Sequence, residues 1–577
     1  MKSDSSLIRK LYLSALLPNV ISVLGGTINV FFDGLLVGRR LGDAGLEAVN
    51  QVLPVYLALC AVGSLIASGA AQLSAMAFGS DDKQEGKRIF GCAMTLALAA
   101  SAIVCAAGLA AARPLAGLLS TEETYAYALT YLRVTLLCGV FKVMLYVPYF
   151  YLRLEGRNKR SMAAMLTMTA LNIALDCLFL FVCDWGVAGA AWASGIATAA
   201  ACLLSFLFLC TRGGNFSLSF ALPRRKDYGG ICRFGAMMAL NNVLSAVKIF
   251  AVNKILALFS YAGATAAFAV VNNISEFSVC VQNGVPQTSG AMTGILYAEK
   301  DAPAVKGLLK TQIAAGAGLS LLLAAALCAL SGQLGGWFGS AADVRTAVCL
   351  FAAGLVPATF NNVMCYYYNA TGSVLMSNVI NVSRGCLAVV LFCLAFSGLG
   401  EWVWLFYPAA ELFTAALFLC AGCAAGRRSG RHFFYLLDAD SEREGRTLAF
   451  SAERTPEGSS AASMRVGEFC EENGLPPKTT MAVSLSVEEM LTVLAEKVPL
   501  RAGRTDVRVR IAGDEVIVRI RSGGRRYNPI ALAQEEEYLG MRLLLGLAER
   551  TEYLSALGVN TFVIFLRTAG ARTGDLS

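Results

Sequence analysis

Two charged segments that stand 219 residues apart decide the fold of this 577-residue chain: Phe78-GSDDKQEGKR-Ile89 and Tyr297-AEKDAPAVKG-Leu308. Their alignment places Lys87 against Lys306, and each segment follows a long apolar stretch. A repeat at this offset predicts two lobes of the same orientation, related by an axis along the membrane normal. Such parallel repeats are typical of alternating-access transporters, and a duplicated membrane scaffold without a transport role stays open as the alternative.

Apolar stretches fill the sequence around these two segments, from about Leu11 to Gly426. Each is long enough for the roughly 20 helical residues that cross a bilayer. About twelve spans are expected, with centres near Val23, Leu59, Ala99, Met144, Leu171, Ala200, Phe250, Phe277, Leu321, Phe360, Val390 and Phe413. The predicted fold is an all-α polytopic membrane protein with six helices in residues 1–215 and six in residues 216–430.

The composition argues against several classes of protein. Hydrophobic residues make up 56% of the chain and charged residues only 15%, outside the range of water-soluble domains. The single histidine, His432, argues against His-ligated metals, Ser-His triads and a histidine phosphorelay. Most of the 18 cysteines lie inside apolar runs, where a thiol behaves as a small hydrophobe. We expect no enzyme activity, no metal site and no cofactor.

The charges of the loops predict the orientation in the membrane. With a cytoplasmic N-terminus, twenty lysines and arginines lie in cytoplasmic connections and four in outer ones, Arg39, Arg40, Arg113 and Arg345. This positive-inside bias predicts a multi-pass protein of the cell membrane with both termini in the cytoplasm. The net charge of +8 then reflects basic residues in cytoplasmic loops, which face anionic lipid, and it does not indicate nucleic-acid binding. The apolar run from Leu11 to about Gly38 is too long for a signal peptide and is expected to be the first span.

Two carboxylates fall inside the predicted spans. Asp33 lies late in span one, within Asn29-VFF-Asp33-GLLVG. Asp176 stands four residues after Asn172 in span five, so Asn172 and Asp176 share a helix face. Ser194 in span six adds a hydroxyl. A carboxylate at the bilayer centre costs about 2.5–3.5 kcal/mol, and this oxygen-only set suits Na⁺ or a proton. The alternative is that Asp33 caps a helix at the outer interface and Asp176 pairs with a basic residue.

Other charges inside the spans have open roles. Lys248 and Lys254 in span seven and Glu276 in span eight are candidate substrate contacts or counter-ions, or snorkelling side chains near an interface. The same alternatives apply to Arg133, Lys142, Arg384 and Glu411.

Residues 431–577 differ from the rest of the chain, because charged residues occur throughout them. Alternation of apolar and charged residues from Val507 to Ile511 and from Val516 to Ile520 predicts two strands. We expect one soluble α+β domain of ordinary size on the cytoplasmic side.

Several motifs in the membrane part resemble the MATE (multidrug and toxin extrusion) family: Phe32-Asp33-GLLVGRRLGDAGLEAVNQVLPV, Asn172-IALD and Pro286-QTSGAMTGILYAEKD. The resemblance implies multidrug efflux by an antiporter, in which inward Na⁺ or H⁺ drives export of organic, often cationic compounds. It also implies a first-lobe cation site made by Asp33, Asn172, Asp176 and Ser194.

The second lobe departs from the pattern of that family. Some branches carry a glutamate in span seven and an aspartate in span ten. Here span seven offers Lys248 and Lys254, and the stretch from Leu350 to Thr371 contains no acid. The resemblance therefore leaves a second-lobe cation site in doubt, and the substrate is expected to be neutral, zwitterionic or anionic.

The tail resembles the GHKL ATPase domain of anti-sigma-factor serine kinases through Ser484-LSVEEMLTVLAEK, Arg521-SGGRRYNP and Gly540-MRLLLGLAERTEY. That family uses a glutamate, an asparagine four residues later for Mg²⁺, and an aspartate for adenine. Glu489 matches the glutamate, but Val493 and Ser522 stand at the other two positions. Valine has no oxygen for a metal, so the resemblance implies a degenerate nucleotide site, a pseudo-ATPase that senses or docks, and a possible cytoplasmic regulatory partner.

The leading hypothesis is a secondary active transporter that exports small organic compounds in antiport with Na⁺ or H⁺, with a pseudo-ATPase regulatory domain. Its expected partners are the small-molecule substrate, the coupling ion and the lipid bilayer. A flippase for lipid-linked or amphipathic precursors is one alternative, and a membrane-anchored signalling receptor is another.

Overall fold

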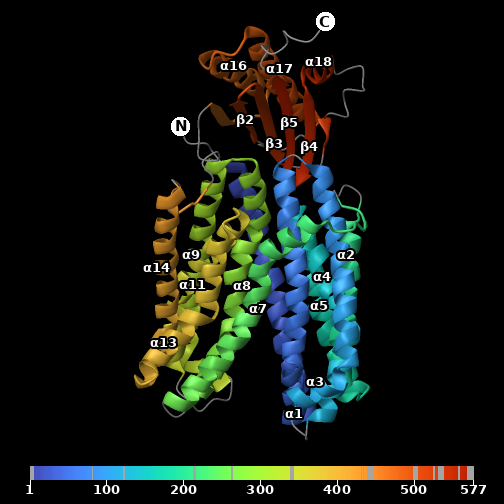
Figure 1. Ribbon diagram of the computed structural model, residues 1–577, viewed down its shortest axis with the longest axis vertical. Coiled ribbons are helices and arrows are strands. Elements are labelled where there is room, and N and C mark those ends of the chain that lie inside the picture. Colours follow the sequence, from blue (N-terminus) through green and yellow to red (C-terminus); the bar gives the residue numbers. More distant parts are fainter. Residues whose placement is uncertain are drawn as a thin grey trace.

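A helical bundle carries a small α+β domain on one of its ends in the computed structural model (Figure 1). We name that end of the bundle the sheet end and the opposite one the far end. The structure describes residues 6–80, 82–120, 124–211, 216–260, 264–337, 344–429, 432, 434–437, 446–497, 504–523, 527–529, 539–556 and 559–567. The predicted domain boundaries involve residues 215, 430 and 431, which lie outside the described residues.

The first lobe begins with α1 (Ser6–Gly79), whose 74 residues would be roughly 110 Å long if straight. It contains two apolar stretches that are each long enough to span a bilayer, Leu7–Asn29 and Gln51–Gly79. The remaining elements of this lobe are α2 (Lys83–Ala110), α3 (Ala112–Leu119), α4 (Tyr125–Leu154), α5 (Asn158–Asp176), a π-helical turn (Cys177–Val182) and α6 (Gly186–Leu209).

The second lobe repeats this arrangement with more interruptions. Its elements are α7 (Arg225–Phe259), α8 (Ala264–Ala298), α9 (Ala302–Trp337), α10 (Arg345–Ala353), α11 (Leu355–Ala370), α12 (Val374–Val382), a π-helical turn (Ser383–Leu387), α13 (Ala388–Phe396), a 3₁₀ turn (Gly400–Leu405) and α14 (Phe406–Ser429).

Eleven stretches of the described residues are long and apolar enough to cross a membrane, so the chain is a multi-pass membrane protein by this criterion. The sequence predicts about twelve. The difference is α8, which forms at the predicted place around Phe277 but carries many amide and hydroxyl side chains along its length.

The two lobes touch at the sheet end and diverge toward the far end (Figure 1). At the contact, Gly235 of α7 packs so closely on α1 that a β-carbon there would overlap the carbonyl oxygen of Leu65. Polar contacts join the lobes at the same end. The Arg88 guanidinium of α2 lies 2.8 Å from the Asp227 carboxylate of α7, and Asn19 Nδ2 donates to Thr288 Oγ1 over 3.1 Å.

The first part of α1 contacts both lobes. The fully buried Tyr12 donates its hydroxyl to the carbonyl oxygen of Val285 in α8, 3.3 Å away. Further along the same helix, Val37 packs against Leu180 and Ala190 of the first lobe. One helix therefore joins the contact between the lobes to the interior of the first lobe.

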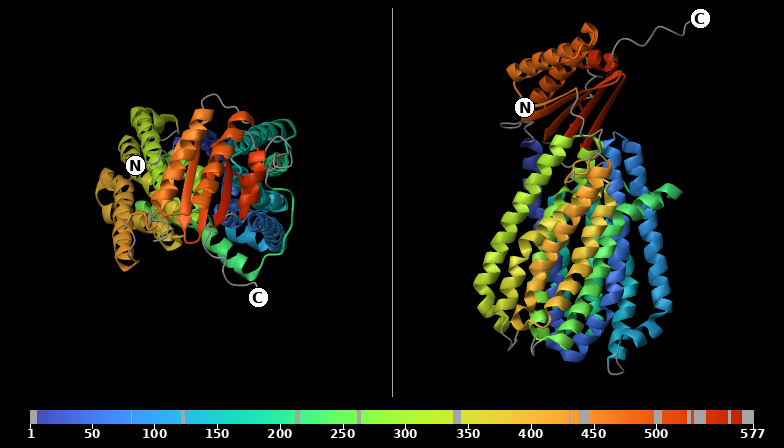
Figure 2. Two further views of the ribbon diagram at one scale, coloured as in Figure 1. Left: turned by 90° about the horizontal axis from the view of Figure 1, so that it is seen from above. Right: turned by 60° about the vertical axis from the view of Figure 1, so that its left-hand side comes forward.

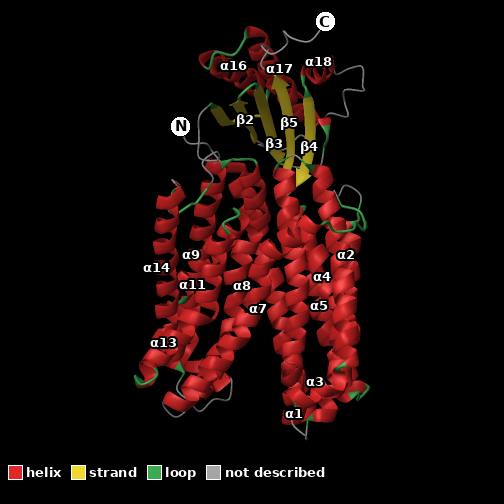
Figure 3. Cartoon of the chain, viewed as in Figure 1, coloured by secondary structure: helices red, strands yellow, loops and turns green. Residues whose placement is uncertain are grey.

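The soluble domain is a five-stranded antiparallel sheet in the order β1-β2-β3-β5-β4, with helices on one face (Figure 3). Its elements are β1 (Thr447–Glu453), α16 (Pro456–Glu472), α17 (Pro477–Lys497), β2 (Arg504–Ala512), β3 (Glu515–Gly523), α18 (Leu539–Leu547), β4 (Arg550–Ala556) and β5 (Val559–Arg567). The helices lie on the side of the sheet that faces away from the bundle (Figure 2). The structure confirms the α+β prediction and both predicted strands.

Alternation sorts the side chains of the sheet into two faces. Apolar residues such as Val507, Val518 and Ile520 pack with the helices in the core of the domain. Arg508 and Arg519 are paired across β2 and β3, and they share the opposite face with Arg521. A row of arginines therefore faces the bundle.

The close contact between the lobes predicts different effects for two glycines of α7. Alanine stabilises a helix interior by about 1 kcal/mol relative to glycine, and a β-carbon at Gly229 meets no atom within 4 Å. Gly235→Ala should instead force α7 away from Leu65 and cost roughly 1–3 kcal/mol. Thermal unfolding of the purified protein in detergent should show a lower melting temperature for Gly235→Ala than for the wild type. Gly229→Ala should show no decrease in melting temperature. Equal melting temperatures would contradict the observed packing.

Candidate functional site

A pocket inside the first lobe holds the residues that the sequence selects. It lies between α1, α4, α5 and α6, and has a cavity volume of about 150 Å³. Asp33, Asn172 and Ser194 line it, and Asp176 is completely buried beside Asn172. The four predicted residues therefore come together, although they are spread over 162 positions of the sequence.

Hydrogen bonds order these four side chains. Asn172 Nδ2 donates to the Asp176 carboxylate, and Ser194 Oγ donates to Asn172 Oδ1 over 3.0 Å. The carboxyl groups of Asp33 and Asp176 are close enough to interact. Two neighbouring carboxylates repel each other unless a proton or a cation lies with them.

Three buried oxygens of this cluster remain unsatisfied: Asn29 Oδ1, Asp33 Oδ1 and Asp176 Oδ1 have no hydrogen-bond partner among the described residues. Buried polar atoms are normally paired, so unsatisfied oxygens that gather at one place fit a small hard cation or a proton. Asp33 lies within α1, four residues beyond the apolar stretch Leu7–Asn29, and Asp176 is hydrogen-bonded to Asn172.

A basic residue shares this pocket. Lys142 of α4 donates to the Tyr56 hydroxyl over 2.5 Å, and its ammonium lies 4.5 Å from the centre of the Tyr56 ring. The sequence shows Lys142 as a charge in span four with an open role. Its pairing with Tyr56 is a contact between distant segments, and nothing in the spacing of the two residues indicates it.

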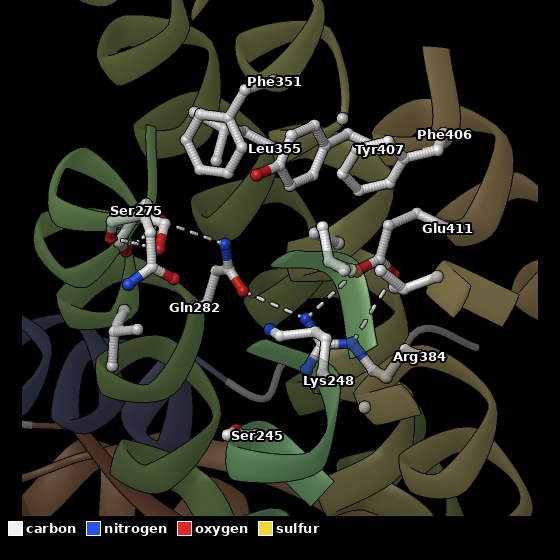
Figure 4. A pocket seen from close by; sticks show the side chains of 18 of the residues that line it. Ser245, Lys248, Ser275, Gln282, Phe351, Leu355, Arg384, Phe406, Tyr407 and Glu411 are labelled. Carbon is white, nitrogen blue, oxygen red and sulfur yellow. Dashed lines mark hydrogen bonds and ion pairs between the residues drawn. The ribbon is translucent and has the colours of Figure 1, made fainter. Parts of the chain in front are cut away.

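The second lobe contains another pocket, with a cavity volume of about 140 Å³ (Figure 4). Lys248, Arg384 and Glu411 line it, and Arg384 Nη2 lies 3.3 Å from Glu411 Oε1. Lys254 and Glu276, which the sequence groups with Lys248, are exposed and do not line this cavity. Among these three residues, only Lys248 therefore lines the pocket.

The arginine face of the sheet meets two acids of the turn between α8 and α9. Arg521 pairs with Glu299 and lies 3.1 Å from Asp301, and Arg508 lies 3.2 Å from Asp301. The side chains of Glu299 and Arg521 are only 2% and 10% exposed. Sequence reasoning missed this cluster, although arginines that alternate with apolar residues in β3 mark a strand face that needs an acidic partner.

The sheet also contacts the first lobe. Lys83, at the start of α2, lies 5.6 Å from the centre of the Tyr553 ring of β4, and Leu554 belongs to an apolar cluster that contains residues of the first lobe and Ile295 of α8. The soluble domain therefore bridges the sheet ends of both lobes.

The three residues of the predicted nucleotide site have different surroundings. Val493 is buried in the apolar core of the domain, and Ser522 is buried at the end of β3, where its hydroxyl has no partner among the described residues. A β-carbon on Gly540, at the start of α18, would overlap the Glu489 carboxylate. Burial and the nearby Glu488 and Glu496 raise the pKa of Glu489.

The described residues contain no group of three or more His, Cys, Asp or Glu side chains that is arranged to hold a metal ion. All 18 cysteines are free thiols, including Cys420 and Cys423, which stand three positions apart on α14.

Comparison with known sequences relates the first lobe to a family. Residues 18–178 match the sequence model of the MatE family. The chain is 26% identical over 248 residues to the multidrug export protein MepA of Staphylococcus aureus strain MRSA252, with 42% of this chain and 54% of that protein covered. The multidrug export protein MepA of Staphylococcus saprophyticus is 26% identical over 246 residues, with 42% and 53% covered. The chain spans about half the length of these curated relatives.

Solved structures extend the likeness to the whole bundle. An outward-facing multidrug resistance MATE family transporter of the MOP superfamily has a TM-score of 0.69 at 22% identity, and covers 73% of this chain and 96% of its own. A MOP superfamily transporter from Pyrococcus furiosus, described as having a binding pocket of reverse polarity that suggests a different function, has a TM-score of 0.67 at 22% identity, with 73% and 95% covered. The membrane part therefore has the MATE fold, and its first lobe carries the MatE sequence pattern.

The contact between the sheet and the bundle predicts a strong effect for Arg521→Ala. Removing one partner of a buried ion pair costs about 3–5 kcal/mol, because Glu299 and Asp301 lose a counter-charge. Amide hydrogen exchange in residues 297–304 should become faster in the intact protein. Arg567→Ala is the matched control, because Arg567 pairs with Glu549 at the surface and is 63% exposed. Unchanged exchange in Arg521→Ala, with the strands still protected, would show that the cluster does not hold the two parts together.

Proposed function

We propose that this protein is a MATE-type secondary active transporter, which exports small organic compounds in exchange for inward Na⁺ or H⁺. The observation that carries the proposal is the buried oxygen cluster of Asp33, Asn172, Asp176 and Ser194 inside the MATE fold. An intramembrane acid pair is costly unless an ion or a proton resides there, so the cluster is a coupling site.

The side chains of the cluster have different roles in ion coupling. Asp33 and Asp176 supply the negative charge, and their unsatisfied oxygens face the position of the ion. Asn172 donates to Asp176 and accepts from Ser194, so it fixes the carboxylate of Asp176 relative to α6. Because Asp33 lies on α1, whose earlier part contacts α8, a change at the ion site also acts on the contact between the lobes.

The positive-inside rule assigns the sheet end to the cytoplasm. With that orientation, the lobes touch on the cytoplasmic side, which is the outward-facing arrangement of an alternating-access transporter. Opening toward the cytoplasm requires the Arg88–Asp227 pair and the packing of Gly235 on Leu65 to separate. Ion binding drives the exchange of states to the extent that its affinity differs between them.

The coupling site gives a direct test. Asp33→Asn and Asp176→Asn should each abolish ion-driven efflux without loss of expression, because an amide carries no charge for the ion. Flux of a panel of organic compounds from proteoliposomes under imposed Na⁺ and pH gradients measures this. Asp184→Asn is the control, because Asp184 pairs with Arg40 at the surface and is 68% exposed. Normal ion-coupled flux in both variants would refute the assignment.

We further propose that residues 431–577 form a pseudo-ATPase that regulates transport. Val493 is buried in the apolar core and offers no metal ligand, and the Glu489 carboxylate packs against the start of α18. The arginine face of the sheet engages the second lobe, and Tyr553 lies beside Lys83 of the first lobe at the same end. A domain that binds both lobes there stabilises their closed contact and slows opening on that side.

Deletion of residues 431–577 separates this regulatory role from a receptor role. We expect ion-driven flux to persist and its rate to rise, because the bridge between the lobes is lost. The measurement is flux in proteoliposomes that contain equal amounts of intact and shortened protein. A protein that binds ligand but shows no flux in either form would favour a signalling receptor.

A further inference from the structure

The second-lobe pocket has an excess of positive charge. Lys248 of α7 and Arg384 of the π-helical turn face the same cavity, and Glu411 of α14 supplies one negative charge (Figure 4). The described residues that line this pocket therefore carry a net charge of +1.

The two basic side chains differ in how they are held. Arg384 is 12% exposed, pairs with Glu411, and also donates to Gln282 Oε1 over 3.0 Å and to Asn362 Oδ1 over 3.3 Å. The ammonium of Lys248 makes no hydrogen bond or ion pair with the described residues. Its charge is close enough to interact with Arg384, with Glu411 and with Glu276, but the guanidinium already engages Glu411, and Glu276 does not line the cavity.

An ammonium inside a membrane protein is costly without a counter-charge. Lys248 faces a cavity, so a ligand can supply that counter-charge. The rest of the cavity offers suitable surroundings for an organic body. Phe351, Phe406 and Tyr407 form an aromatic wall, and Ser245 and Ser275 add hydroxyl groups (Figure 4). Pockets with an apolar wall and a few convergent polar groups are typical of small-molecule sites.

We propose that the second-lobe pocket binds organic acids with one net negative charge, whose carboxylate pairs with Lys248 and whose apolar or aromatic body lies against Phe351 and Tyr407. As the assignment of a transported substrate class, this rests on the proposed transport function. The two pockets then have opposite preferences, since paired acids mark the first lobe and spare basic charge marks the second. A cation and an anionic compound occupy different lobes and do not compete for one site.

Three isosteric probes test the sign of the preferred charge: 2-naphthoate, the neutral 2-naphthamide and the cationic 2-naphthylmethylammonium. Equilibrium binding to the purified full-length protein is measured by titration calorimetry without any ion gradient. The naphthoate should bind at least about tenfold more tightly than the amide, which corresponds to about 1.4 kcal/mol. Lys248→Met should remove that advantage, and Lys248→Arg should keep most of it.

Lys254→Met is the matched control, because Lys254 lies on the same helix and is exposed outside the cavity. It should leave the affinity for naphthoate unchanged. Because the titration is made without any ion gradient, its result does not depend on ion-driven flux, which separates a failure of the pocket from a failure of coupling. Equal or tighter binding of the amide or the ammonium, or no saturable binding of naphthoate to the wild type, would overturn the proposal.

Discussion

The backbones of α1 and α7 come into contact because glycine stands at their crossing. That contact sets the relative position of the two lobes, and the other features follow from it. The Arg88–Asp227 pair closes the sheet end. The soluble sheet is then able to reach both lobes, because its arginines pair with Glu299 and Asp301 and its Tyr553 lies beside Lys83 of α2.

The two pockets carry charges of opposite sign, although the two lobes repeat the same arrangement of helices. In the first lobe, a π-helical turn begins directly after Asp176, and in the second lobe a π-helical turn contains Arg384. π-helical turns are rare and occur frequently at functional sites, because they change the direction of side chains within a helix. Spans five and eleven are equivalent in the repeat, so the same backbone feature supports an acid in one lobe and a base in the other.

The sequence predicts the features that depend on local or regular signals. Apolar length defines the spans, the repeated segments define the two lobes, and the four-residue spacing of Asn172 and Asp176 puts both on one helix face. The α+β tail and its strands follow from a change in composition and from alternation. The predicted span that does not meet the hydropathy criterion is α8. It forms at the expected position, but it carries amide and hydroxyl side chains that contact other helices and the pocket.

What the sequence does not predict are contacts between distant segments. The pairing of Lys142 with Tyr56 and of Arg384 with Glu411 depends on which helix faces which. Spacing along one helix carries no such information. The arginines of the sheet and the acids of the α8–α9 turn are separated by more than 200 residues, so only the docked arrangement shows that they compensate each other.

The sharing of α1 between the lobes also bears on how the protein is made. Tyr12 finds its partner only at Val285, 273 residues later. At 5–20 residues per second, a ribosome needs roughly 15 to 55 s to cover that distance. During this time the first membrane helix has no second lobe to pack against, and its tyrosine hydroxyl and neighbouring amides must be solvated by lipid headgroups, water or the insertion machinery. Assembly of the bundle is thus completed late, after the second lobe has entered the membrane.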